Sequence, residues 1–362
     1  MKILVFSANT SRKILDPLDT VDVQTKIVSG GTSDILTRNV HVITAGRRAI
    51  REFDPDIILG NGALCYPAMA LGSVYDVPTI LRIPGNVWHE GRELARHARE
   101  TNDVPRWIGY LGATALKSTF RYANGFIAVS THIRDVIIDR TGCSAESVAV
   151  VHSPVRYDQY RGGNPDRFIE QYDLSDGRTL VTVTDITFDP KFEGAKQTIK
   201  SIVEVLQDDD SLTYLLAYDA RKNEPKLEAY VDRVAPPSVR DRIHLLGYVD
   251  DIADLYAAGD VFVYTSFLDG YPNAVLEAQA AGLPVVVNAA QGMTDQVVDG
   301  ETGLLAEADG SDLEDRVRYV LSNRTIADQI GSTAANRISR HNDPAKVGER
   351  MAAALERFSS SD

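Results

Sequence analysis

Short apolar runs alternate with amphipathic stretches along the chain. In the first part, runs with the length and composition of buried strands lie at residues 3–7, 57–59, 79–83, 126–129 and 148–151. Stretches with helical spacing lie between them, at residues 47–53, 66–75 and 131–140. This alternation is typical of a parallel sheet with helices on both faces. We therefore expect a doubly wound, Rossmann-like α/β domain over residues 1–155.

A second alternation begins near residue 180. Its strands are expected at residues 180–184, 214–217, 243–245, 261–264 and 284–287. This pattern predicts a second Rossmann-like domain over residues 179–343. Residues 156–178 are polar and rich in Gly, Pro and Asp, a composition typical of a hinge or linker. The end of the chain, residues 344–362, is expected to hold a final helix.

The most informative stretch covers residues 260–305. A continuous apolar strand, residues 261–264, leads through a Gly/Pro turn into a helix expected to begin at about Asn273. The unpaired N–H groups and the dipole of such a helix N-terminus form an anion site. Asp269 and Glu277 stand on either side of it, with seven residues between them. Because carboxylates repel an anion, we interpret both as acceptors for neutral hydroxyls. A ligand that joins phosphate to many hydroxyls is a nucleotide sugar.

The same residues resemble a known family. Asp-x7-Glu with Gly-Tyr-Pro-Asn inside it, followed by EAQAAGLPVV from Glu277 and DGETGLL from Asp299, is similar to the donor-site signature of family 4 retaining glycosyltransferases. That family usually has Glu at the first position, so the carboxylate of Asp269 is drawn back by one methylene. The resemblance implies the GT-B architecture, in which two Rossmann-like domains face each other across an interdomain cleft. In that architecture the last helix often crosses back to the first domain.

The resemblance also implies roles for the residues of the signature. Glu277 would accept hydrogen bonds from ribose hydroxyls, and Asp269 would accept one from the sugar. Each carboxylate has a plain alternative, since Glu277 could complement the helix dipole and Asp269 could serve an Asp-Gly turn. Backbone contacts to base, phosphate and sugar are expected from Tyr248 and from Gly270, Tyr271, Pro272, Asn273 and Ala274, although Pro272 has no N–H to give.

The cation for the donor phosphates is not where the family places it. Relatives usually have Gly-Arg after the first strand of the second domain, where this chain has Thr184 and Asp185. A carboxylate cannot hold a diphosphate, so Lys191 is the expected cation and Lys196 the second choice, with solvated surface lysines as the alternative. The predicted catalytic residues are thus Lys191, Glu277 and Asp269.

Two further places in the first domain are candidate binding sites. Gly30 and Gly31 end a strand-like run and would let the backbone approach the donor phosphates or the acceptor, or they form a plain turn. The strand at residues 79–83 should carry the acceptor side at its carboxyl end, because α/β sheets bind ligands there. The acceptor-side candidates, for which capping and packing are the alternative roles, are Arg82, Asn86, His89 and Glu90.

Residues 92–122 reverse the charge balance of the chain. They hold six Arg or Lys against three acids, with Trp107, Tyr110 and Phe120 between them. Such a stretch could rest on anionic lipid headgroups and reach a lipid-linked acceptor. Alternatively, it covers the first domain with its aromatic rings inward.

Composition adds a setting. The net charge of −13 and the pI of about 5.0 argue against a general nucleic-acid binder. The chain has 28 Arg and 35 Asp against 10 Lys and 16 Glu. An Asp-rich, Lys-poor surface is typical of halophilic organisms such as salt-loving archaea, and genomic bias toward Arg is the alternative.

Cys65 and Cys143 form neither a metal cluster nor a disulfide framework, which favours a reducing cytoplasm. No signal peptide or membrane span is expected, so the predicted location is cytoplasmic, with peripheral contact at the inner face of the cell membrane if residues 92–122 bind lipid. No metal or other cofactor is expected, because no convincing Asp-x-Asp follows a strand.

The sequence thus predicts a hexosyltransferase-type retaining glycosyltransferase. It would move a sugar from a nucleoside diphosphate sugar to an acceptor hydroxyl in glycan or polysaccharide assembly. Two alternatives remain. A nucleotide-sugar epimerase shares the architecture but would need further acid and base groups. A catalytically silent GT-B-fold protein that binds a partner enzyme or a glycan is kept open by Asp185 and Asp269.

Overall fold

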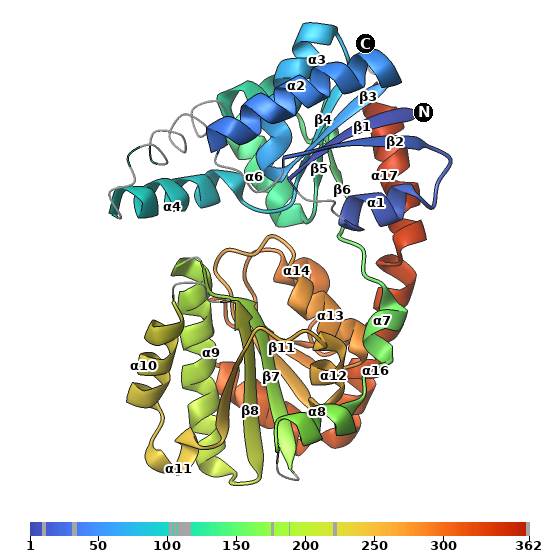
Figure 1. Ribbon diagram of the computed structural model, residues 1–362. Helices are drawn as coiled ribbons and strands as arrows, with labels where there is room; N and C mark the ends of the chain where they lie inside the picture. Colours follow the sequence, from blue (N-terminus) through green and yellow to red (C-terminus); the bar gives the residue numbers. More distant parts are fainter. Residues whose placement is uncertain are drawn as a thin grey trace. The chain divides into compact units, whose positions relative to one another are not determined.

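The computed structural model of the chain describes residues 1–8, 12–30, 35–100, 104, 107, 117–174, 177–187, 189–219 and 223–359. The chain divides into two compact units. Unit 1 comprises Met1–Pro154 and Pro344–Asp362, and unit 2 comprises Val155–Asp343. Each unit holds its own six-stranded sheet with helices packed on it (Figure 1). The predicted α/β fold with two Rossmann-like sheets is therefore confirmed.

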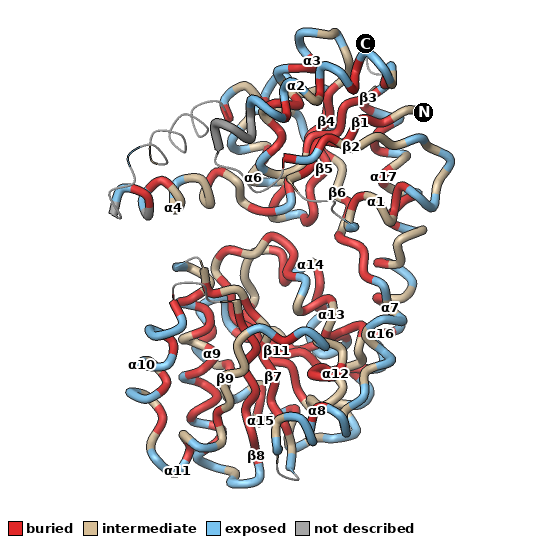
Figure 2. The backbone as a smooth tube through the Cα atoms, in the orientation of Figure 1, coloured by how far each residue is buried: buried red, intermediate tan, exposed pale blue. Residues whose placement is uncertain are grey.

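Unit 1 is built on a sheet in the order β2-β1-β3-β4-β5-β6, in which neighbouring strands run parallel. The central strands are buried on both faces (Figure 2). This burial explains why they form continuous apolar runs in the sequence. The strands are β1 (Lys2–Ser7), β2 (Gln24–Ser29), β3 (Ile57–Asn61), β4 (Thr79–Ile83), β5 (Gly125–Ala128) and β6 (Val148–Val150).

The helices of unit 1 begin and end at recognisable residues. In α6, Ser130 accepts a hydrogen bond from the Ile133 N–H at 3.2 Å, and Gly142 ends the helix at φ 71°. The helical elements are α1 (Arg12–Leu18), α2 (Ile35–Phe53), η1 (Gly62–Leu64), α3 (Cys65–Tyr75), α4 (Val87–Glu100), η2 (Lys117–Tyr122), α6 (Thr131–Thr141), η3 (Ala145–Ser147) and α17 (Pro344–Ser359).

The last helix, α17, completes the core of unit 1. Its buried residues recur at helical spacing, with Val347, Met351, Leu355 and Phe358 packed in one cluster with residues of β1 and β3. Gly125 of β5 lies directly beneath it, and a Cβ at that position would be 2.3 Å from the Phe358 ring. The sheet therefore needs glycine there for α17 to approach.

Unit 2 is built on a second parallel sheet, in the order β12-β11-β10-β7-β8-β9. The five strands β7 to β11 correspond to the five predicted runs. The edge strand β12 was not among the predicted runs. The strands are β7 (Arg178–Asp185), β8 (Leu212–Asp219), β9 (Ile243–Gly247), β10 (Val261–Tyr264), β11 (Val285–Asn288) and β12 (Leu304–Ala306).

Residues 156–178, predicted as a hinge, contain two short helices that pack on unit 2. Arg167 of α8 forms an ion pair with Asp254 of α12, whose side chain is 6% exposed. The helices of unit 2 are α7 (Tyr157–Arg161), α8 (Pro165–Gln171), α9 (Asp189–Asp208), α10 (Glu224–Val234), α11 (Pro237–Arg240), α12 (Ile252–Ala257), α13 (Asn273–Ala281), α14 (Met293–Gln296), α15 (Leu313–Ser322) and α16 (Arg324–His341).

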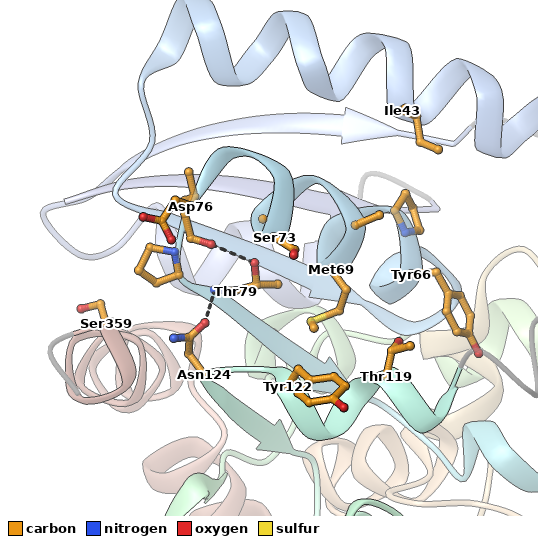
Figure 3. A pocket seen from close by; sticks show the side chains of 15 residues that line it. Ile43, Tyr66, Met69, Ser73, Asp76, Thr79, Thr119, Tyr122, Asn124 and Ser359 are labelled. Carbon is orange, nitrogen blue, oxygen red and sulfur yellow. Dashed lines mark hydrogen bonds between the residues drawn. The ribbon is translucent and has the colours of Figure 1, made fainter. Parts of the chain in front are cut away.

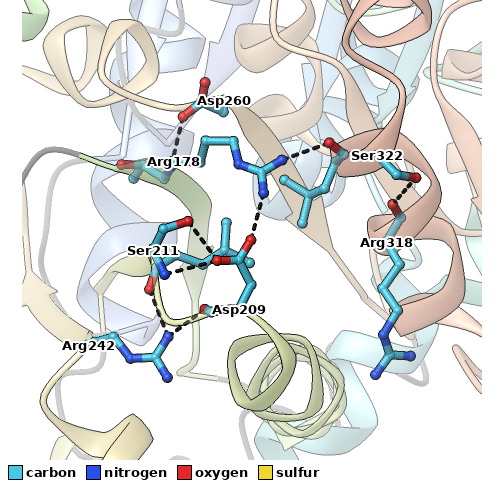
Figure 4. A network of polar contacts seen from close by, with 10 residues as sticks. Arg178, Asp209, Ser211, Arg242, Asp260, Arg318 and Ser322 are labelled. Carbon is cyan, nitrogen blue, oxygen red and sulfur yellow. Dashed lines mark hydrogen bonds and ion pairs between the residues drawn. The ribbon is translucent and has the colours of Figure 1, made fainter.

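A polar network ties together the amino edge of the second sheet (Figure 4). Arg178, the first residue of β7, donates to Asp209 Oδ2 and to the Leu321 carbonyl, both at 2.7 Å. Hydrogen bonds from Ser211 lower the pKa of Asp209, and Arg178 adds to this effect. Arg242 donates to the carbonyl of Asp209 at 2.8 Å. The amino edge is thus occupied by structural contacts, and the carboxyl edge carries the candidate site.

Candidate functional site

The strand order of unit 2 brings two distant loops together. β7 and β10 are neighbours in the sheet, although β8 and β9 lie between them in sequence. Such a reversal of strand order opens a crevice at the carboxyl edge of a parallel sheet. The segment after β7 carries Lys191 in the first turn of α9, and the loop after β10 carries Asp269.

Lys191 and Asp269 form an ion pair at this edge. Lys191 Nζ lies 2.8 Å from Asp269 Oδ1, and the two side chains are 20% and 14% exposed. Because both charges are largely shielded from water, removing either one would leave the other buried without a partner, which is strongly unfavourable. The two residues predicted to hold phosphate and sugar are therefore side by side.

Asp269 has a second donor on its other oxygen. The hydroxyl of Tyr264, the last residue of β10, donates to Oδ2 at 2.5 Å. Burial raises the pKa of Asp269, but the Lys191 ammonium and hydrogen bonds from Lys191, Tyr264 and Ser266 outweigh this and lower it. The carboxylate is therefore ionised at neutral pH and keeps acceptor capacity on both oxygens.

Glu277 lies in α13, on the turn after the helix begins. Its Oε2 accepts a hydrogen bond at 3.1 Å from Tyr256 of α12. Burial and the neighbouring Glu277 carboxylate raise the pKa of Tyr160 of α7. The predicted alternative, a carboxylate that only complements the helix dipole, needs no such partner. The Tyr256 hydroxyl thus fixes the position of the Glu277 carboxylate.

The sequence interpretation missed Tyr160, Tyr256 and Tyr264. Tyr256 and Tyr264 are among the core residues, 1% and 3% exposed. In the sequence they look like ordinary core aromatics, because nothing in their spacing shows where the hydroxyl points. Only the packing of α7, α12 and β10 around α13 reveals that these hydroxyls reach the two carboxylates.

The loop between β10 and α13 is braced from the neighbouring loop. Gly292 packs on Gly270, and a Cβ on Gly292 would lie 1.6 Å from the Gly270 carbonyl oxygen. The Gln296 amide donates to the Pro272 carbonyl at 2.9 Å. The Asn288 side chain bonds both the N–H and the carbonyl of Ser266, at 3.1 and 3.2 Å. The backbone at the α13 N-terminus is thus fixed before any ligand binds.

The other predicted donor residues are spread around this loop. Asn273 is exposed at the first position of α13 and Ala274 is half-buried. Tyr271 is 7% exposed, and its hydroxyl receives a hydrogen bond from Asn342 at 3.3 Å, so its ring belongs to the core. Tyr248 lies after β9 at the same carboxyl edge and is 77% exposed.

Lys196 and Asp185 do not join the Lys191–Asp269 pair. Lys196 Nζ lies 2.6 Å from Glu193 Oε1 and over the rings of Phe192 and Tyr230. Asp185, the last residue of β7, accepts the N–H of Thr187 at 2.8 Å. Lys191, and not Lys196, therefore lies beside Asp269.

Arg82 is buried at the carboxyl edge of the first sheet. It is 3% exposed and donates to Asn61 Oδ1 at 3.1 Å and to Ser153 Oγ at 3.5 Å. Its Nε has no hydrogen-bond partner in the part of the chain that the structure describes. Burial lowers the pKa of Arg82 to about 10. It is a buried cation on the predicted acceptor side.

The remaining acceptor-side candidates lie at the start of α4. Asn86 Oδ1 accepts the His89 N–H at 3.0 Å, which is a capping role. Glu90 lies beside Gly85 and near Lys117, which donates to the Val87 carbonyl. Burial lowers the pKa of Lys117 to about 8, against the opposing charge of Glu90. These contacts order the helix start.

The two glycines predicted to approach the donor or the acceptor, Gly30 and Gly31, follow β2. Gly30 is buried after β2, whereas Gly31 lies outside the described residues.

Phe120 is 1% exposed and its ring packs against Tyr66 and Trp88, so it faces inward. Phe120 therefore follows the alternative prediction for residues 92–122, in which the aromatic rings face inward. Tyr110 lies outside the described residues.

A cavity of about 820 Å³ lies elsewhere in unit 1 (Figure 3). Thr79 and Asn124 line it where the Thr79 N–H donates to Asn124 Oδ1 at 2.8 Å, and Met69, Tyr66 and Tyr122 supply apolar surface. Because Thr79 begins β4, the cavity reaches the amino end of the strand whose carboxyl end holds Arg82. No sequence pattern pointed to it.

The described residues lack both a metal-binding cluster and a membrane-spanning helix. They contain no cluster of three or more His, Cys, Asp or Glu placed to hold a metal ion. None of their helices is both long enough and apolar enough to cross a membrane.

Comparison with known families covers both halves of the chain. Residues 3–159 match the model of Glycosyltransferase Family 4, and residues 177–323 match that of Glycosyl transferases group 1. Both halves of the chain belong to glycosyltransferases of the family 4 type. The family resemblance inferred from residues 260–305 is thereby confirmed, whereas retention and a halophilic source stay predictions.

The chain is similar to several curated enzymes over part of their length. It is 25% identical to trehalose synthase of Pyrococcus horikoshii over 181 residues, which are 48% of this chain and 43% of that protein. It is 30% identical to the capsular polysaccharide biosynthesis glycosyltransferase CapM of Staphylococcus aureus over 95 residues, 26% of this chain and 25% of that one. These first relatives are thus matched over less than half of their length.

Solved structures match the whole chain in fold. The HepE protein of Anabaena in complex with UDP-glucose has a TM-score of 0.74 and 18% identity, over 99% of this chain and 100% of that one. Sucrose-phosphate synthase of Thermosynechococcus elongatus has a TM-score of 0.75 and 14% identity over 100% of both. The predicted GT-B fold is confirmed.

Proposed function

We propose that the chain is a retaining glycosyltransferase that uses a nucleoside diphosphate sugar. The observation that carries the proposal is the ion pair of Lys191 and Asp269, 2.8 Å apart beside the braced start of α13. In such a donor, phosphate oxygens and sugar hydroxyls are neighbours. A cation next to a carboxylate matches that order, because the cation meets the phosphate and the carboxylate accepts a sugar hydroxyl.

The remaining donor contacts come from α13 and its surroundings. Glu277 accepts the ribose hydroxyls, and the free N–H groups at the start of α13 meet the diphosphate. Exposed Tyr248 lies beside the base. HepE, which has the same fold, is solved with UDP-glucose, so a uridine diphosphate sugar is the first donor to test.

The transfer step that we propose needs no protein nucleophile. The acceptor hydroxyl attacks the anomeric carbon on the face from which the diphosphate leaves, so the configuration is retained. The bond from sugar to phosphate breaks, and the leaving phosphate oxygen takes the proton of the hydroxyl. Lys191 and the α13 N-terminus stabilise the negative charge that develops on the diphosphate.

For the acceptor we propose a growing glycan carried on a lipid. The chain is 31% identical over 94 residues, 26% of this chain and 25% of that one, to the N,N'-diacetylbacillosaminyl-diphospho-undecaprenol alpha-1,3-N-acetylgalactosaminyltransferase of Campylobacter jejuni. Arg92, Arg96 and Arg99 are exposed on one face of α4, while Ala95 and Ala98 are buried on the other. A basic helical face of this kind suits an anionic membrane surface.

A catalytically silent member is the second candidate, and Asp185 favours it. Asp185 stands where the family usually has an arginine, so the donor phosphates lose one cation. Such a protein would bind a nucleotide or a glycan without transferring sugar.

The test is a thermal-shift screen in high salt with uridine, guanosine, adenosine and thymidine diphosphate sugars. A true donor raises the melting temperature progressively above its dissociation constant. Release of the nucleoside diphosphate on adding glycan acceptors then separates a transferase from a silent binder. No shift with any of the four donors would overturn the proposal.

A further inference from the structure

Each carboxylate of the signature is contacted by a buried tyrosine hydroxyl. Tyr264 donates to Asp269 Oδ2 at 2.5 Å, and Tyr256 donates to Glu277 Oε2 at 3.1 Å. The tyrosines come from different elements, β10 and α12, and are 3% and 1% exposed. Two different elements, β10 and α12, thus each supply one hydroxyl to one of the two carboxylates that are proposed to bind the donor.

The rings that carry these hydroxyls form one packed row. Tyr160 and Tyr256 meet edge to face with centroids 6.0 Å apart, Tyr256 and Phe262 lie 5.9 Å apart, and Phe262 and Tyr264 stack at 6.1 Å. Tyr256, Phe262 and Tyr264 belong to one core cluster. Because a ring locked in a core cannot swing, its hydroxyl oxygen has a fixed position.

The direction of these hydrogen bonds is also fixed. Burial raises the pKa of Tyr256 and Tyr264 well above the usual value, and the neighbouring carboxylates raise both further. The tyrosines therefore stay protonated and donate, since an ionised carboxylate only accepts. Each hydroxyl occupies one acceptor position of its carboxylate and so sets the rotation of the carboxylate plane.

Ring packing in this row does not require a hydroxyl, and the second contact of the Tyr256 hydroxyl, to the Ala274 carbonyl oxygen at 3.4 Å, is longer than its contact with Glu277. Phe262 lies between the two tyrosines in the same row and packs with no hydroxyl. A phenylalanine at either tyrosine would keep the ring contacts and spare the cost of burying a polar group. A role beyond packing is the simplest reason for a hydroxyl aimed at a carboxylate in both places.

We propose that Tyr256 and Tyr264 are positioning residues that hold Glu277 and Asp269 in the orientation that the donor requires. The inference rests on the proposed function and adds a division of labour. Tyr256 acts through Glu277 on the ribose, and Tyr264 acts through Asp269 on the transferred sugar.

The experiment measures the binding of UDP and UDP-glucose by titration calorimetry to Tyr256→Phe, Tyr264→Phe and the parent chain. If the screen selects another base, its diphosphate and its sugar diphosphate replace these two probes. Tyr256→Phe should weaken both ligands by about tenfold, because both contain ribose. Tyr264→Phe should weaken UDP-glucose by about tenfold and leave UDP unchanged, because UDP has no sugar to place.

Tyr214→Phe is the matched control. Tyr214 is fully buried in β8, and its hydroxyl has no carboxylate partner among the residues with described positions. Its loss should change neither affinity. A second readout is the pH at which UDP-glucose binding is lost in acid. Tyr264→Phe removes a hydrogen bond that lowers the pKa of Asp269, so this pH should rise, and Tyr214→Phe should not move it.

The outcomes separate this inference from the proposed function. A parent chain that binds no donor overturns both. If Glu277→Gln and Asp269→Asn lose donor binding while both phenylalanine variants keep it, the proposed function stands and the positioning role fails. A phenylalanine variant that does not fold shows a structural hydroxyl and overturns the role for that residue. Equal weakening of UDP and UDP-glucose by Tyr264→Phe overturns the division of labour.

Discussion

Gly292 lies against the backbone of Gly270, so close that a Cβ at residue 292 would be 1.6 Å from the Gly270 carbonyl oxygen. One loop, after β11, thereby supports the loop that carries Asp269. Because the clash would be with backbone, no side-chain rotation can relieve it. The loop that carries Asp269 can therefore keep its shape only if residue 292 is glycine.

We therefore predict that Gly292→Ala displaces the Asp269 loop and abolishes donor binding. It should also lower the free energy of unfolding by about 1–3 kcal/mol, the usual cost of overpacking. Gly162→Ala is the control, since the nearest atom to its Cβ would be a carbonyl oxygen at 3.6 Å. Chemical denaturation and donor titration of both variants check this. Normal donor binding by Gly292→Ala would show that the loop is not held there.

The lowered pKa of Asp269 predicts a dependence of stability on acid. A carboxyl whose pKa is lower in the folded state contributes stability above its ordinary pKa, 3.8 for Asp, and that stability is lost as pH falls through the folded value. Asp269→Asn has no carboxyl at this position and therefore lacks this pH-dependent contribution to stability. The difference in the free energy of unfolding between parent and Asp269→Asn should therefore shrink as pH is lowered below about 4. Urea denaturation between pH 2.5 and 7 measures it, and a constant difference would contradict the ion pair.

Glu277→Gln should lose donor binding with little effect on stability. The change removes an ionised acceptor for two ribose hydroxyls, which costs about 2–4 kcal/mol of binding free energy. Asp315→Asn is the control for the dipole role, because Asp315 is a first-turn carboxylate of α15 with 76% exposure. Isothermal titration with the donor found in the screen decides whether Glu277 binds ribose or only complements the helix dipole. Unchanged affinity for Glu277→Gln would remove it from the site.

Part of the fold and of the candidate site could be predicted from the sequence, and part could not. The elements and the signature were predictable, because apolar periodicity and the Gly/Pro turn are local properties of the chain. The pairing of Lys191 with Asp269 follows from the order of β7 and β10 in the sheet, which no local pattern records. Tyr256 and Tyr264 were missed for the same reason, since the direction of a buried hydroxyl depends on tertiary packing.

We predict that Arg82 serves function and does not stabilise the fold. Replacing it by Met keeps most of the buried volume and removes a cation whose only partners in the described residues are neutral, Asn61 and Ser153. Arg82→Met should therefore have an equal or higher melting temperature. Arg242→Met should be destabilised by about 2–3 kcal/mol, because Arg242 donates to several carbonyls at the amino edge. Calorimetry of both variants tests the contrast. A large drop for Arg82→Met would make Arg82 a structural residue.

The basic face of α4 predicts salt-sensitive membrane binding that does not involve Phe120. Each exposed arginine near an anionic surface contributes about 1 kcal/mol at low salt, an attraction that molar salt screens. Arg96→Ser/Arg99→Ser should therefore reduce co-sedimentation with anionic liposomes at low salt. Arg48→Ser/Arg51→Ser removes the same charge from the exposed face of α2 and should not.

Phe120→Ala completes the test of that surface. Phe120 is packed against Tyr66 and Trp88, so its removal should lower the free energy of unfolding by about 3–5 kcal/mol without a specific effect on liposome binding by the folded protein. Equal loss of binding in both arginine pairs would show only a general charge effect. Absence of liposome binding by the parent chain at every salt concentration would leave α4 as a solvated helix and favour an acceptor that is not membrane-bound.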